Sequence, residues 1–197
     1  MSTTTDKIIL ASESPRRREL LNGMGVRFEV VTARVRELAG ATSPHLSPAE
    51  LAHENARRKA KAVAALRPGR WVLGADTVVA LEKRVMGKPD SIDQARDFLT
   101  ALSGETHEVI TACALIAPDG EAEIFHDISR VTLRVLSHQT IGRYLGEVNV
   151  LDKAGAYALQ ERGEWIVERV EGSRANIIGL PTEALEQVLI RRGLRKR

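Results

Sequence analysis

The sequence has 197 residues, of which 43% are hydrophobic and 28% charged, and this composition is typical of a single globular domain, here residues 1–197. A net charge of +3 and only two Trp, two Tyr and three Phe argue against nucleic-acid binding. The single cysteine, Cys113, excludes an internal disulfide. No apolar run is long enough to cross a bilayer, and Met1–Lys7 does not resemble a signal peptide. We therefore expect a cytoplasmic protein that binds no membrane.

The first predicted element is a buried strand over the apolar residues 7–11. Ser14 then offers a helix N-cap and Pro15 a favoured first helical position, so a helix is expected from Pro15 to about Met24. Three arginines follow at positions 16–18, where the helix dipole is positive and acidic residues are preferred. A bound anion such as phosphate would explain them, and a solvated basic helix start is the alternative.

The next elements alternate between strand and helix. Arg27–Thr32 has the composition of a strand, and residues 33–46 have that of a loop. Ser47, Pro48 and Glu50 form a capping box with proline at the first helical position, so a long helix is expected to run to about Pro68.

A short apolar strand, Trp71–Ala75, is expected to present Asp76 and Thr77 at its C-terminal end, where ligands bind in open α/β sheets. A carboxylate at that edge can hold a metal ion or activate water, although it can also simply cap a turn. A hairpin over 78–85 and a turn holding Lys88 follow. Lys88 is either a ligand-facing lysine or an ordinary surface lysine.

The remaining elements complete an α/β pattern with a mixed sheet. The residues indicate a helix over 91–102, a strand pair over 108–116 and 124–135, and a helix from Ser137 to about Leu145. The stretch 152–160 fits a tight packing site or a ligand-facing strand, with a buried loop as the alternative. A strand near Trp165–Val167 and a final helix from about Thr182 to Arg192 close the chain.

Seven ordered motifs resemble one family across residues 7–189. They are Leu10-Ala11-Ser12 with Ser14-Pro15-Arg16-Arg17, Leu73-Gly74-Ala75-Asp76-Thr77, Gly87-Lys88-Pro89, Leu102-Ser103-Gly104, Thr106-His107, Asp152-Lys153-Ala154-Gly155-Ala156-Tyr157 and Gly179-Leu180-Pro181. These motifs look like those of the Maf proteins, which are nucleoside triphosphate pyrophosphatases once described as septum-formation inhibitors. The resemblance implies a mixed twisted sheet flanked by helices, with two lobes around a central cleft, similar to the inosine triphosphate pyrophosphatases.

The resemblance also implies roles for individual residues. The expected catalytic residues are Asp76, Lys59 and Lys88, the expected substrate-binding and specificity residues are Ser12, Arg16, Arg17, Thr77, Lys153 and Gln160, and the expected ligands of Mg²⁺ or Mn²⁺ are Glu37, Asp76 and Asp152. The family lysine of the long helix falls on Lys59 or, with a shift, on Lys61, and counting back from Asp76 favours Lys59. Glu161 stands where the family often has glycine.

The trio Arg16, Thr77 and Gln160 resembles the subgroup that hydrolyses dTTP and UTP, including some modified pyrimidine triphosphates. Attack on the α-phosphorus would release pyrophosphate, with Asp76 accepting a proton from water. Such an enzyme would remove selected triphosphates from the nucleotide pool. A non-catalytic nucleotide-binding regulator of septum formation and a pyrophosphatase for purine or 7-methylguanine triphosphates remain alternatives. The sequence leaves the oligomeric state open, with a homodimer as one option.

Overall fold

The computed structural model describes residues 7–196. Residues 1–6, which belong to the segment expected not to be a signal peptide, lie outside the described part, as does residue 197 of the expected domain. Its strands are β1 Ile8–Leu10, β2 Phe28–Val30, β3 Val72–Leu81, β4 Arg84–Met86, β5 Thr106–Ile116, β6 Ala122–Leu133 and β7 Val167–Glu171. Its helices are α1 Pro15–Gly23, α2 Pro48–Leu66, α3 Ile92–Leu102, α4 His138–Glu147, α5 Gly163–Ile166, α6 Arg174–Ile178 and α7 Thr182–Arg191, with 3₁₀ turns η2 Gly40–Thr42 and η3 Ala154–Ala156. Within residues 7–196, none of the helices is both long and apolar enough to cross a membrane.

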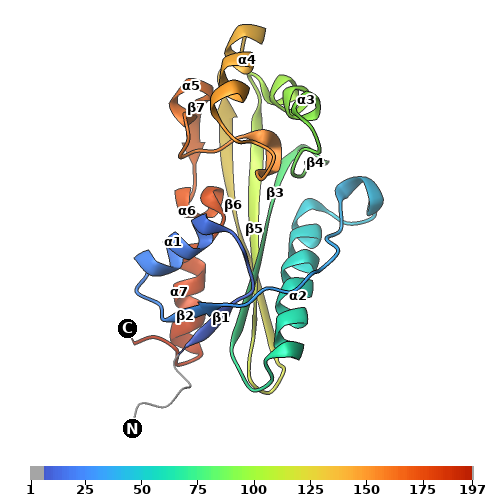
Figure 1. Ribbon diagram of the computed structural model, residues 1–197. Coiled ribbons are helices and arrows are strands. Elements are labelled where there is room, and N and C mark those ends of the chain that lie inside the picture. The colour runs from blue at the N-terminus through green and yellow to red at the C-terminus, as the bar shows by residue number, and fades with distance from the viewer. Residues whose placement is uncertain (1–6, 197) are drawn as a thin grey trace.

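All seven strands form one sheet in the order β2-β1-β3-β5-β6-β7, with β4 added to β3. The strands β2, β1 and β3 are parallel neighbours, whereas β3, β5, β6 and β7 are antiparallel. This mixed sheet flanked by helices confirms the expected α/β class. The long strands β3, β5 and β6 run most of the height of the molecule in Figure 1 and connect its lower and upper parts.

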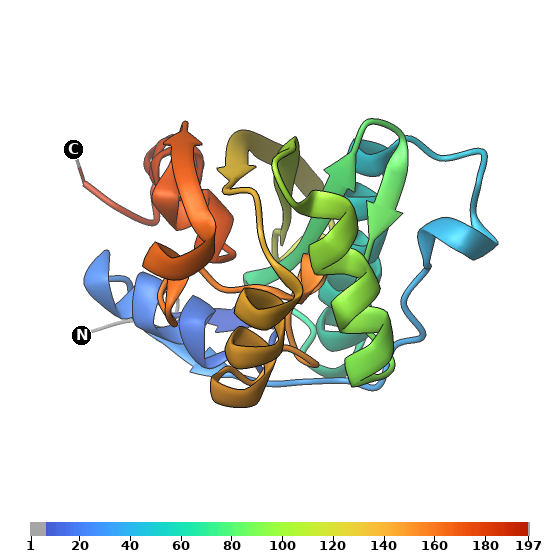
Figure 2. The ribbon, with the colours of Figure 1, turned by 90° about the horizontal axis from the view of Figure 1, so that it is seen from above.

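Helices cover both faces of the lower half of the sheet. The helix α2 packs one face with alanines and other small apolar side chains, while α1 and α7 pack the opposite face (Figure 2). Both faces of β3 are buried there, because its even-numbered residues face α2 and its odd-numbered residues face α1 and α7. We call β1, β2, α1, α2 and α7, with the sheet segment between them, the lower lobe.

The upper half of the molecule has a separate apolar core. It is formed by α3, α4, η3 and the upper ends of the long strands, with Tyr144, Leu99 and Leu102 among its fully buried side chains. We call α3, α4, α5, β4, β7 and η3 the upper lobe (Figure 1). One sheet therefore carries two helical layers at different heights, which confirms the two-lobed architecture.

The structure confirms the helix starts that the sequence predicted. Ser14 accepts a hydrogen bond from the Arg17 backbone N–H at 3.4 Å, and Pro15 is the first residue of α1. At α2 the capping box is complete, since the side chains of Ser47 and Glu50 each bond to the other's backbone N–H. Both signals depend on contacts within four residues, which is why the sequence alone reveals them.

Two expectations were wrong. Asp76 and Thr77 do not end a strand, because β3 continues to Leu81 and pairs with β5 along nearly all of its length. The segment around Trp165 is the short helix α5, and the strand begins only at Val167. For the stretch 152–160, a tight packing site, a ligand-facing strand and a buried loop were open, and the structure shows a loop with the single turn η3. Asp76 and Thr77 stay within a strand because β3 pairs with β5 well beyond Ala75, a long-range contact that the local apolar pattern does not reveal.

Candidate active site

The site lies at a gap along one edge of β3. On that edge β1 pairs with Val72 and Leu73, and β4 pairs with residues 79–81, so no described strand pairs with residues 74–78 there. The chain leaves β1 at Ala11 and turns into α1, which opens a crevice between the two lobes. Asp76 and Thr77 sit in the middle of the strand at this gap, and both line the crevice. A crevice where neighbouring strands diverge is the usual ligand position in α/β sheets.

A cavity of about 770 Å³ fills this crevice, within the range of cavities that hold small-molecule ligands. All eleven residues that the sequence singled out line it: Ser12, Arg16, Arg17, Glu37, Lys59, Asp76, Thr77, Lys88, Asp152, Lys153 and Gln160. They come from both lobes, so the cavity exists only in the folded chain. Their roles stay predictions, while their convergence is a property of the structure.

Asp76 is 6% exposed and faces α2. The Lys59 ammonium donates to Asp76 Oδ1 at 2.6 Å and contacts Glu37 Oε1 at 2.8 Å, so one lysine bridges two carboxylates. Gly74 permits this arrangement, since a Cβ there would lie 2.4 Å from the Ala56 carbonyl oxygen of α2. The helix can therefore approach the strand closely enough for its lysine to reach the carboxylate.

Glu37 is held ionised by its neighbour. Partial burial of the Glu37 carboxyl would raise its pKa, but the charge and hydrogen bond of Lys59 outweigh burial and lower that pKa below the ordinary value. Glu37 and Asp76 together offer the carboxylate oxygens that Mg²⁺ prefers, and Mg²⁺ is commonly held by one or two carboxylates plus substrate phosphates. The donor set therefore fits such an ion, although residues 7–196 contain no cluster of three or more acidic, His or Cys side chains.

Thr77 points to the opposite face of β3, where it meets Arg17. The Arg17 guanidinium donates to the Gly179 carbonyl at 2.8 Å, to Ser12 Oγ at 3.1 Å and to Thr77 Oγ1 at 3.0 Å. All three acceptors are uncharged, and Arg17 has no ion pair with a carboxylate of the described chain. Burial lowers the pKa of Arg17, while the charge of Asp76 opposes that shift. A cation is thus fixed in the cavity without a counter-ion in contact.

The upper lobe contributes two lysines. The Gly155 N–H donates to the Gly87 carbonyl at 3.1 Å, which ties the Asp152–Tyr157 segment to the turn that carries Lys88. Gly155 has φ of +70° and lies so close to Val79 that any Cβ would be 2.9 Å from its side chain. Lys153, 5% exposed, contacts Asp152 at 2.9 Å and Glu161 at 3.1 Å. Lys88 forms no ion pair within the described residues and is exposed at the cavity wall.

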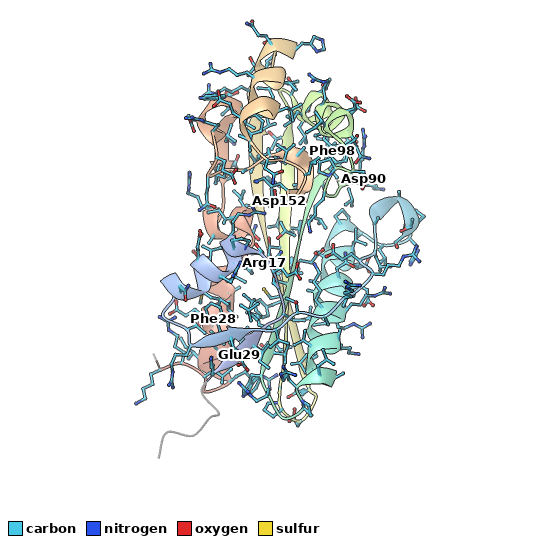
Figure 3. The ribbon with its side chains drawn as sticks, viewed as in Figure 1. Arg17, Phe28, Glu29, Asp90, Phe98 and Asp152 are labelled. Carbon is cyan, nitrogen blue, oxygen red and sulfur yellow. The ribbon has the colours of Figure 1, made fainter. Side chains whose placement is uncertain are left out.

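Asp152 spans the crevice rather than joining the other carboxylates. Its Oδ2 accepts a hydrogen bond from Arg16 Nη1 at 3.1 Å, which connects the upper lobe to α1 (Figure 3). Burial would raise the pKa of Asp152, but hydrogen bonds from Lys153 and Arg16 lower it overall. The structure therefore brings Glu37 and Asp76 together on Lys59, whereas Asp152 is paired with two cations. Gln160 lies exposed at the rim of the same cavity.

Sequence reasoning missed three residues of the site. Arg34 lines the cavity from the loop after β2, and Tyr157 lines it from the position directly after η3. The Tyr157 hydroxyl lies 2.7 Å from Nε2 of His107. Burial lowers the pKa of His107 to about 4. The third is Asn55, which is 3% exposed on α2 and donates to Asp76. Asn55 had a readable signal, namely a polar residue within the apolar stripe of a helix, and Tyr157 already stood in a family motif, although without an assigned role.

The cavity wall carries six cationic and four acidic side chains. Such an excess of positive charge at a crevice in an α/β sheet is typical of proteins that bind multiply charged anionic ligands. Comparison with known proteins then identifies the family. The chain belongs to the family described as "Maf-like protein", whose model matches residues 7–192.

Curated relatives resemble the chain over nearly its whole length. A protein of Nitratidesulfovibrio vulgaris named dTTP/UTP pyrophosphatase is 41% identical to this chain, and the match covers 97% of this chain and 90% of the relative. A protein of the same name in Akkermansia muciniphila is 44% identical, and the match covers 92% of this chain and 94% of the relative. Among solved structures, the Ham1 protein of Staphylococcus aureus has a TM-score of 0.53 at 16% identity and covers 95% of this chain and 99% of its own. That likeness concerns the fold alone, and it agrees with the two-lobed α/β architecture.

Proposed function

We propose that this protein is a nucleoside triphosphate pyrophosphatase that hydrolyses dTTP and UTP to the monophosphate and pyrophosphate. The observation that carries the proposal is Arg17, a cation held by three uncharged acceptors in a cavity that also contains the predicted carboxylates and lysines. The names of its relatives support the same substrates. We further propose that it acts on the cytoplasmic nucleotide pool as a house-cleaning enzyme.

The triphosphate would bind where the positive side chains converge. A guanidinium has five N–H donors, so the three bonds of Arg17 leave two for phosphate oxygens. Ser12 is part of the same network, and Lys88 and Lys153 supply charge from the facing wall. Binding to both lobes would also bring the α-phosphate over the gap in β3.

Asp76 is the proposed proton acceptor. Each of its oxygens accepts one hydrogen bond, from Lys59 and from Asn55, and so keeps lone-pair capacity for a water molecule. The water oxygen would bond to the α-phosphorus, its proton would pass to Asp76, and the bond from that phosphorus to the bridging oxygen would break. A divalent ion held by Glu37 and Asp76 would neutralise phosphate charge and increase the acidity of water. Lys59 keeps the two carboxylates together.

The choice of base is assigned to Arg16, Thr77 and Gln160. Gln160 can donate and accept hydrogen bonds at once, which suits the edge of a pyrimidine. Arg16 reaches Asp152 across the crevice, and that contact would be exchanged for substrate contacts when a nucleotide enters. Asp152 itself remains proposed as a third ligand of the ion.

A panel of standard and modified triphosphates tests the function directly. Pyrophosphate release should be greatest with dTTP and UTP, and it should require Mg²⁺ or Mn²⁺. Asp76→Asn should reduce turnover about 10²–10⁴-fold, as expected for loss of a general base, while a triphosphate still raises the melting temperature. Activity limited to purines would overturn the substrate assignment, and binding without turnover in the wild type would favour the nucleotide-binding regulator. Sedimentation of the same sample would decide whether the protein is a homodimer.

A further inference from the structure

Asn55 is a polar residue at a position where the fold requires burial. It is 3% exposed, and its neighbours on the same face of α2 include Leu51, Ala52 and Ala56, which are all buried. A buried amide is costly unless its donors and acceptor are bonded. The side chain must therefore be explained by what it bonds.

Each polar atom of the Asn55 amide has a partner. Its Oδ1 accepts the Leu38 backbone N–H at 2.8 Å, and its Nδ2 donates to the Leu38 carbonyl at 3.0 Å and to Asp76 Oδ2 at 3.2 Å. The reverse orientation of the amide would place donor against donor at the N–H and acceptor against two acceptors elsewhere. The three contacts therefore fix a single orientation.

These contacts close a ring around the two carboxylates. Leu38 follows Glu37 directly, so Asn55 ties the backbone that carries Glu37 to the side chain of Asp76. Lys59, one helical turn further along α2, joins the same two carboxylates at 2.8 Å and 2.6 Å. One helix thus presents an amide to hold the loop and an ammonium to hold the charges.

We propose that Asn55 is a positioning residue that sets the separation between Glu37 and Asp76 and thereby the affinity for the divalent ion. The inference rests on the proposed function, because it concerns the ion that these carboxylates would hold. Residues 31–39 contain no helix or strand in the structure, so the position of Glu37 depends on such tethers. Residues that orient metal ligands from behind commonly change metal affinity or activity 10–100-fold when replaced.

The test replaces the amide by an apolar side chain of similar size. Asn55→Leu should raise the Mn²⁺ concentration for half-saturation at least 10-fold, measured by electron paramagnetic resonance without nucleotide, and raise the Mg²⁺ requirement of pyrophosphate release similarly. Hydrogen exchange of the Leu38 amide should accelerate at least 10-fold while amides in the middle of α2 keep their protection. Should the leucine variant not fold, Asn55→Ser, too short to reach both Leu38 and Asp76, serves in the same measurements.

Val63→Ala is the matched control. It removes buried apolar volume from α2 two turns beyond Asn55 and lowers stability, and it removes no hydrogen bond to Leu38 or to the carboxylates. Its Mn²⁺ affinity and Leu38 exchange should equal those of the wild type. Unchanged Mn²⁺ affinity in the folded Asn55 variant, or an equal loss in the control, would overturn the inference. A wild type that binds Mn²⁺ but hydrolyses no triphosphate would refute the proposed function instead, and the exchange measurement would still test the tether.

Discussion

Arg17→Ala is the substitution that separates anion binding from structural support most clearly. In most proteins an arginine this enclosed would neutralise a carboxylate, and its loss would leave that carboxylate buried and unpaired. Here the guanidinium bonds only to Gly179, Ser12 and Thr77, through a carbonyl and two hydroxyls. Truncation therefore removes the fixed positive charge from the cavity without leaving an unpaired anion behind.

The size of the effect follows from the two N–H donors that the protein does not use. A hydrogen bond to a charged group contributes about 1.5–3 kcal/mol, so two bonds to phosphate amount to about 3–6 kcal/mol. Since about 1.4 kcal/mol corresponds to a factor of ten, kcat/KM for dTTP should fall about 10²–10⁴-fold. The free energy of unfolding without ligand should also fall, because the three bonds that the charged guanidinium donates within the protein are lost, by about 1.5–3 kcal/mol per bond at most. The rise in melting temperature that a triphosphate causes separates this loss from the loss of anion binding.

The assay combines pyrophosphate release with thermal unfolding in the presence and absence of triphosphate. Arg18→Ala is the control, because Arg18 is exposed in the same turn of α1, carries the same charge and bonds only to the Glu13 carbonyl at 3.4 Å. It should keep activity and triphosphate stabilisation close to those of the wild type. Equal losses in both variants would show that only the overall charge matters, and the reasoning from the Arg17 geometry would then be refuted.

Three further outcomes follow from the structure. Lys59→Met should lower the free energy of unfolding near neutral pH. Because Lys59 lowers the pKa of Glu37, the difference in free energy of unfolding between variant and wild type should be complete above the ordinary glutamate pKa and shrink as the pH falls through the lowered pKa. Urea unfolding at a series of pH values would measure this difference. Gly74→Ala should lower the free energy of unfolding by about 1–3 kcal/mol through overpacking. Gly146→Ala in α4, where an added Cβ would have no neighbour within 4 Å, should raise the free energy of unfolding by about 0.5–1 kcal/mol. Equal melting temperatures of the two variants would contradict this prediction. Burial raises the pKa of Cys113 to about 12, so a thiol reagent at pH 8 should label it only after denaturation, and rapid labelling of the native protein would disprove its burial.

Interactions between near neighbours in the chain could be predicted from the sequence. The starts of α1 and α2 were found from Ser14 and Ser47 because a capping side chain bonds to a backbone group three residues away. The misplaced charge of the arginines at 16–18 indicated an anion site for the same local reason. The resemblance to the Maf proteins added the candidate residues, all of which line one cavity.

How those residues combine depends on contacts between distant parts of the folded chain. Asp76 was expected at the end of a strand, but it sits in the middle of β3 and lines the cavity because two different strands cover only the two ends of one edge. Asn55 was overlooked because its partners lie 17 and 21 residues away, and Arg16 meets Asp152 across 136 residues. The helix starts and the set of charged side chains follow from the sequence, since these depend on local chemistry. Which charge is paired and which is left for a ligand depends on distances that exist only after the chain has folded.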